Sequence, residues 1–141
     1  MKVLIAAVCD HAWVENGCLS VFRTFDSIKA DSFPFTLSRI SVALRILIGR
    51  LEYGGHELVI ILAGSKGEKL MNSRININFN PPQDYLPEAA FSFALNGQNI
   101  IFPNPGDYAM DILIDGKVEA CVPLYVRENI GGKSIDIPDR I

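Results

Sequence analysis

Strict alternation along residues 37–48 limits, more than any other feature, how this chain can fold. Branched aliphatic side chains occupy every second position there, namely Ile40, Val42, Leu44, Ile46 and Ile48. A period of two places them on one face of a β-strand, whereas an amphipathic helix needs apolar residues three and four positions apart. Taken alone, the segment SRISVALRILIGRL is also compatible with a helix. Its β-branched residues and the strands expected on both sides of it favour the strand.

Similar patterns predict strands along most of the chain, in the ranges 2–11, 18–28, 56–63, 70–79, 91–95, 100–102, 108–114 and 117–126. Asn16-Gly17 and Asp115-Gly116 favour type I′ hairpin turns, and Asn96-Gly97 predicts another turn. The proline-rich segment 80–87 predicts a crossing between sheets or a wrap around a sheet edge, because proline cannot donate to a strand ladder. About nine strands with turns every 8–12 residues or so are typical of a β-sandwich or barrel.

The segment Pro105-Gly106-Asp107-Tyr108 resembles the tyrosine corner of immunoglobulin-like sandwiches, in which a tyrosine early in the penultimate strand bonds back to the backbone. Met110 stands where antibody-type domains have a cysteine, so their disulfide is not expected here. We therefore predict one all-β domain over residues 1–126, an antiparallel β-sandwich of immunoglobulin-like type. A jelly roll or a small barrel is the alternative. Residues 127–141 are polar and interrupted by glycine, which predicts a mobile tail.

Charge and hydropathy argue against several classes of protein. The 141 residues carry a net charge of −3 without a cluster of Lys or Arg, so nucleic acid is not an expected partner. No apolar run approaches the roughly 18 residues of a membrane-spanning helix, so we expect no membrane association. The apolar run 3–8 is shorter than the core of a secretion signal, which has about 7–15 residues. That run and the odd number of cysteines favour reduced thiols in the cytoplasm.

Cys9, His11 and Cys18 form the only cluster in the sequence that could bind a metal. A structural zinc site uses four ligands in paired spacings, which this cluster lacks, so core packing is the favoured role. A thiol nucleophile would require His56 to approach Cys9 or Cys121, which the sequence neither supports nor excludes.

Other motifs of catalysis and cofactor binding are missing. There is no Gly-x-Ser-x-Gly and no glycine-rich phosphate loop, and Gly131-Gly132-Lys133-Ser134 lacks the first glycine of a Walker loop. Asp107 and Asp115 could bind calcium at one end of a sandwich, but their predicted turns favour backbone capping. We therefore assign no catalytic residue and no cofactor, and favour a protein that is not an enzyme.

Trp13, Tyr53 and Tyr85 lie in predicted loops or at strand ends, where they could form a platform for a sugar or a peptide, or pack at the sheet ends. Pro123 predicts an edge position or a bulge in the last strand, and a free edge can accept a strand from a partner. Isoleucines alternate in part along the tail, at positions 130, 135, 137 and 141. The tail could therefore add as a strand to a neighbouring copy, which predicts a homodimer or a higher oligomer.

Three segments together resemble an uncharacterised family of small bacterial proteins: residues 7–12, residues 17–22, and residues 105–108 followed by Asp115-Gly116. The resemblance spans most of the chain and implies a bacterial source, but that family has no assigned activity. The sequence favours a non-catalytic binding or assembly module that acts through a sheet edge or the tail. The alternative is a small-molecule-binding or hydrolytic protein that uses loops at one end of the sandwich, with His11 or His56 beside an acid or a thiol.

Overall fold

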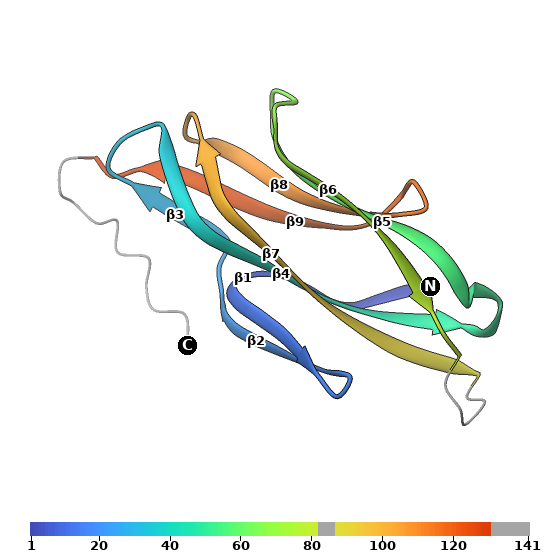
Figure 1. Cartoon of the computed structure of the whole chain (residues 1–141). Helices are drawn as coiled ribbons and strands as arrows, with labels where there is room; N and C mark the ends of the chain where they lie inside the picture. Colours follow the sequence, from blue (N-terminus) through green and yellow to red (C-terminus); the bar gives the residue numbers. More distant parts are fainter. Residues whose placement is uncertain (82–86, 131–141) are drawn as a thin grey trace.

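The computed structural model describes residues 1–81 and 87–130, and in this part of the chain nine strands form two sheets. In chain order the elements are β1 (Lys2–Glu15), β2 (Cys18–Thr24), β3 (Ser27–Ala30), β4 (Phe35–Gly49), the 3₁₀ helix η1 (Arg50–Glu52), β5 (Gly54–Gly64), β6 (Lys69–Phe79), β7 (Glu88–Phe102), β8 (Gly106–Ile114) and β9 (Lys117–Glu128). The sheets have the strand orders β2-β1-β4-β7 and β3-β9-β8-β5-β6 and pack face to face (Figure 1). The predicted all-β sandwich is confirmed. No described helix is long and apolar enough to cross a membrane.

The strand order is that of an immunoglobulin-like sandwich. β4 and β7 are neighbours in one sheet, and β9, β8 and β5 are neighbours in the other. This matches strands B and E against strands G, F and C of the immunoglobulin fold. The pairs are antiparallel apart from β3 with β9, which run parallel over four residues. In the chain, β3 follows β2, which belongs to the other sheet. It therefore reaches β9 by a crossing between the sheets and not through a hairpin, which would have made the pair antiparallel.

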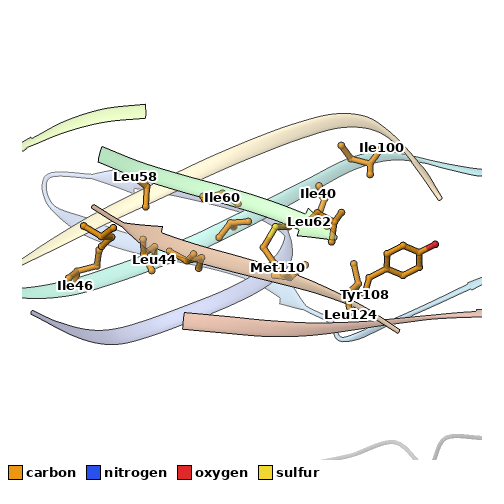
Figure 2. Close-up of a cluster of buried hydrophobic side chains, with 14 of the residues drawn as sticks. Ile40, Leu44, Ile46, Leu58, Ile60, Leu62, Ile100, Tyr108, Met110 and Leu124 are labelled. Carbon is orange, nitrogen blue, oxygen red and sulfur yellow. The ribbon is translucent and has the colours of Figure 1, made fainter. Parts of the chain in front are cut away.

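The alternation that predicted β4 is matched by its burial. The five aliphatic residues on its inner face are each at most 1% exposed. They pack between the sheets against the inner residues of β5 and β8, among them Leu58, Ile60 and Met110 (Figure 2). Burial of each large aliphatic side chain stabilises the fold by about 1.5–3 kcal/mol. This layer between the sheets is therefore the main source of stability.

A second, smaller cluster lies on the outer face of the first sheet. Cys9, Ala12 and Ala43 are almost completely buried there. They are covered because β1 continues past its pairing with β4 as a hairpin with β2. The tip of this hairpin lies over β4, where the carbonyl of Gly17 accepts a hydrogen bond of 3.3 Å from Nη1 of Arg45. Small side chains on this face allow the two layers to approach closely.

Two details of the predicted strands are wrong. The predicted strand 18–28 is divided, because β2 ends at Thr24 and the chain then crosses to the second sheet as β3. The predicted turn at Asn96-Gly97 lies instead in the middle of β7, which pairs with β4 without a register shift. Glycine serves packing at this position, since an added Cβ would lie 3.2 Å from Sδ of Met71 and 3.3 Å from Cγ2 of Ile40. The two errors cancel in the number of strands.

The predicted turns and the tyrosine corner are present. Asn16-Gly17 and Asp115-Gly116 close hairpins with a positive φ at both residues of each pair, as type I′ turns require. Tyr108 lies near the start of β8, and its hydroxyl donates a hydrogen bond of 2.7 Å to the carbonyl of Asn104. A tyrosine corner has this geometry, and Met110 follows it on the inner face of the strand.

The end of the chain and the proline-rich segment lie partly outside the described residues. β9 continues beyond the predicted domain limit at residue 126 to Glu128, because its last residues pair with β3. Residues 131–141 of the predicted mobile tail are not among the described residues. The segment 80–87 carries the chain from β6 in one sheet to β7 in the other, as predicted, and its residues 82–86 are also outside the description.

Candidate functional site

β7 forms one edge of the first sheet, and no described strand pairs with its outer side. The strand has 15 residues and follows β4 without a register shift. It contains no proline, and its only charged residue is Glu88, at one end. In a paired strand about half of the backbone N–H and C=O groups point away from the neighbour. The outer side of β7 therefore presents a long row of unpaired donors and acceptors.

The other described edge strands each carry a feature that discourages pairing with another chain. β3 has only four residues. β2 has seven, and one of them is the charged Arg23. β6 carries the charged residues Lys69 and Arg74. Among the edge strands in the described part of the chain, β7 is the longest and is almost free of charge, although Asn99 near its end adopts a positive φ of 53°.

A cleft opens between the two sheets beside this edge. It has a volume of about 420 Å³ and lies between β7 and β6, the edge strand of the second sheet. Its lining combines apolar side chains, including Ile60, Met71, Ile75 and Leu95, with the polar side chains of Ser73, Arg74 and Asn96. Side chains of a strand added to β7 would alternate across the sheet, so every second one would enter the cleft. The edge and the cleft together can recognise both the backbone and the side chains of an extended segment.

The cleft offers little for acid–base chemistry. Arg74 is the charged residue in its lining, and it donates a hydrogen bond of 3.0 Å to Oε1 of Glu57. The hydroxyl in the lining is that of Ser73, and no described His, Asp or Glu side chain lines the cleft beside it. A general base within reach of a hydroxyl or a water would be needed for hydrolysis. The arrangement suits apolar contacts and backbone pairing.

The structure does not bring Cys9, His11 and Cys18 together around one point. Cys9 is buried and its thiol donates to the carbonyl of His11 at 3.4 Å, whereas Cys18 is exposed beside the hairpin turn. Burial raises the pKa of the Cys9 thiol, which opposes formation of the thiolate that binds metals. Nδ1 of His11 is buried and has no described hydrogen-bond partner. Within residues 1–81 and 87–130, no three Cys, His, Asp or Glu side chains could share a metal ion.

Of the aromatic residues proposed as one platform, Trp13 and Tyr53 lie in different surroundings. Trp13 is 42% exposed on the β1–β2 hairpin and stacks on the ring of His11. Phe22 lies opposite His11 in the hairpin and is 55% exposed, so it extends this aromatic surface. Tyr53 instead packs against the core between the sheets, and its hydroxyl is buried. Tyr85 lies outside the described residues.

Pro123 lies on the part of β9 that β3 does not cover. The N–H of Tyr125, two residues later, donates to the carbonyl of Asp26 and so points away from β8. Because N–H groups two residues apart point to the same side of a strand, the nitrogen of Pro123 faces the uncovered edge. Proline thus removes a donor from that edge and discourages pairing there. The edge most open to a partner is β7, on the other side of the sandwich.

A polar cluster that the sequence did not identify lies at one end of the sandwich. Nδ1 of His56, near the start of β5, is bonded to Oδ2 of Asp115 in the β8–β9 turn. Nε2 of the same ring lies 2.6 Å from the carbonyl oxygen of Glu52. The bond to Asp115 raises the pKa of His56, partial burial opposes this, and the bond to Glu52 adds to the increase. The pKa of Asp115 is lowered, mainly because the N–H of Glu57 donates a hydrogen bond of 2.9 Å to its Oδ1. The bond to His56 is the second cause.

The chemistry of this cluster suits a structural role. Both ring nitrogens of His56 face acceptors, so both donate, which is possible only for the imidazolium. An imidazolium has no lone pair with which to bind a metal or remove a proton. An open hollow of about 360 Å³ beside the cluster is lined in part by Glu52 and Lys117. The hydrolytic alternative expected a histidine beside an acid. The structure places Asp115 beside His56, but the ring of His56 is not a free base.

Comparisons with known proteins give one family. A family of unknown function, DUF6941, matches residues 4–127, which confirms the resemblance to an uncharacterised family. No curated protein matches the chain. A glycosyl hydrolase family 2 member from Bacteroides cellulosilyticus DSM 14838 is among the solved structures that match, with 14% identity and a TM-score of 0.36. The match covers 62% of this chain and only 12% of that one, and a TM-score this low supports no conclusion about function.

Proposed function

Since the chain belongs to DUF6941, a family of unknown function, we propose from its structure that it is a non-catalytic binding module that pairs with an extended strand along the free edge of β7. The observation that carries the proposal is the state of this edge. It is 15 residues long, without proline and with one terminal charge, while the other described edge strands are shorter and most carry internal charges. Long edges with few charges are sites of association, which natural proteins otherwise avoid.

The cleft beside β7 supports the same function and indicates what the partner strand looks like. Backbone hydrogen bonds to β7 would supply affinity, and alternate side chains in the cleft would supply specificity. The apolar part of the lining, formed by Ile60, Met71, Ile75 and Leu95, suits aliphatic or aromatic residues at every second position. The partner segment should therefore alternate apolar residues over about six to ten positions and contain no proline within them.

Site-specific photocrosslinking tests this function. A photoreactive amino acid replaces Gln98, which is exposed on β7, in the full chain produced in its native cells. We expect a discrete crosslinked product, with the crosslink mapped by mass spectrometry to an extended segment with alternating apolar residues. The matched control places the same amino acid at Val118, which is 54% exposed on β9, away from the β7 edge. Absence of a product at position 98, or the same products at both positions, would contradict the proposal.

We further propose that the protein works in a reducing compartment, such as a bacterial cytoplasm. Cys9, Cys18 and Cys121 are all free thiols, and two of them are exposed. Exposed cysteines persist in this form where glutathione and thioredoxin keep thiols reduced. Alkylation in intact cells, followed by mass spectrometry, should find these three thiols reduced. A species linked through Cys18 or Cys121 by a disulfide would contradict this location.

A further inference from the structure

We infer that the strand that pairs with β7 is β7 of a second copy of this chain. The two four-stranded sheets would then join into one continuous sheet across a two-fold axis near Leu95, the middle residue of the strand. This inference rests on the proposed function, because it names the occupant of the same edge. A two-fold axis makes the contact self-complementary and closed, as in most homodimers.

The charges of β7 permit this self-pairing. In an antiparallel pair of identical strands, each residue lies opposite the residue equally far beyond the axis. With the axis near Leu95, the two Glu88 carboxylates lie at opposite ends of the interface, about 45 Å apart. Arg74 on the neighbouring strand β6 is already paired with Glu57 at 3.0 Å. The contact therefore keeps the carboxylates apart. Arg74 lines the same cleft as Leu95, so its two copies lie near the axis, where each guanidinium keeps its own Glu57 as partner.

The size of the edge is adequate for a stable dimer. At about 3.4 Å per residue the strand is roughly 50 Å long, and two sheets about 10 Å apart give an edge face roughly 15 Å high. Each copy would then bury about 750 Å², close to the roughly 800 Å² per partner of a standard interface. A fully paired strand would add about 14 backbone hydrogen bonds, within the usual range of about 10 ± 5.

A second copy of β7 fits this edge better than the tail of the chain. Residues 131–141 provide eleven positions against the 15 of β7, and Pro138 within them would interrupt a ladder. They also follow β9, which lies in the second sheet, three strands away from the edge strand β6. The β7 strand offers a partner of equal length without proline, and its offset against β4 stays constant along the strand.

The test measures the mass and the amide exchange of the purified full chain. Light scattering at high micromolar concentration should give twice the chain mass of 15.6 kDa. Hydrogen exchange of the β7 amides should become faster on dilution into the monomer range, while that of the β5 amides stays slow. Leu95→Lys should weaken self-association by about 100-fold or more, because it places two ammonium groups together at the axis. Val118→Lys is the matched control and should remain a dimer.

The outcomes separate this inference from the proposed function. A monomeric wild-type chain that still crosslinks through position 98 to a different protein would overturn the self-pairing and leave strand capture in place. A dimer in which β7 exchange does not change on dilution would place the contact elsewhere and overturn the self-pairing. The dilution experiment needs no variant, so it decides the question even where Leu95→Lys does not fold.

Discussion

The carboxylate of Asp115 accepts a hydrogen bond from Nδ1 of His56, and this bond joins the β8–β9 turn to the start of β5. The other ring nitrogen is bonded to the carbonyl of Glu52 in η1, so one imidazolium connects three elements at this end of the sandwich. The pKa of His56 is raised and that of Asp115 is lowered, as expected for a pair that stabilises its own charges.

Asp115→Asn should therefore destabilise the protein in a pH-dependent way. Asparagine keeps the turn and an acceptor for the N–H of Glu57 but removes the charge. The stabilisation from His56 is fully present below its ordinary pKa of about 6.5, and it is lost as the pH rises through its raised pKa. The stabilisation from Asp115 is fully present above its ordinary pKa of about 3.9, and it is lost as the pH falls through its lowered pKa. Urea unfolding should show the largest loss between about pH 4 and 6.5, near 1 kcal/mol because Asp115 is half-exposed. A loss independent of pH would contradict the charged pair.

Tyr108→Phe and Tyr53→Phe should have opposite consequences. The Tyr108 hydroxyl donates to Asn104 at 2.7 Å, and its removal should lower the free energy of unfolding by about 1 kcal/mol. The Tyr53 hydroxyl is buried without a partner among the described residues, so its removal should be neutral or stabilising. Thermal and urea unfolding of both variants measure the contrast. Equal losses of unfolding free energy in the two variants would show that the hydrogen bond from Tyr108 to Asn104 adds no stability beyond the packing of the ring.

How much of this structure the sequence predicts depends on the range of the interactions. Alternation assigns the inner face of β4 correctly, because each side-chain direction depends only on its own strand. The turn at Asp115-Gly116 is also correct, since its geometry depends on two residues. Asn96-Gly97 has the same local preference, but β7 pairs with β4 along its whole length, and these many long-range bonds override a single turn signal.

The candidate site depends on strand order, which alternation does not specify. His56 and Asp115 meet only because β5 pairs with β8. The free edge of β7 and the cleft beside it exist only because β7 and β6 are the last strands of their sheets. Pro123 did indicate an uncovered edge, but the signal of β7 is the opposite one, a strand without proline or internal charge.

Ala43→Leu should disrupt the packing of the β1–β2 hairpin on the first sheet. Ala43 is fully buried beside Cys9 and Ala12, so extra methylenes have no space and should cost about 1–3 kcal/mol. Proteolysis within the hairpin should become faster. The matched control is Ala63→Leu, at a half-buried position on the outer face of β5, which should change the unfolding free energy by less than about 0.5 kcal/mol. Equal effects at the two positions would contradict a buried second cluster.

Gly116→Ala should destabilise the β8–β9 hairpin, because the residue has a φ of +82°. A Cβ in this region costs about 1–2 kcal/mol, even though no atom lies within 4 Å of its position. Gly55→Ala is the control, since that position also has open space but no positive φ. It should be neutral or stabilising by up to about 1 kcal/mol through the unfolded chain. Urea unfolding of both variants separates backbone strain from crowding.

The last prediction concerns Cys121, which lies opposite Asp111 in the β8–β9 pair. The Asp111 carboxylate accepts a hydrogen bond from the thiol, and this bond, partial burial and the negative charge raise the pKa of Cys121. Because the thiolate is the reactive form, Cys121 should be alkylated slowly at pH 7.5 although it is exposed. Asp111→Asn should increase the alkylation rate of Cys121 several-fold and leave that of the exposed Cys18 unchanged. Iodoacetamide labelling followed by peptide mass spectrometry measures both rates in one sample. An unchanged Cys121 rate would show that Asp111 does not control the thiol, and a parallel change at Cys18 would indicate general unfolding.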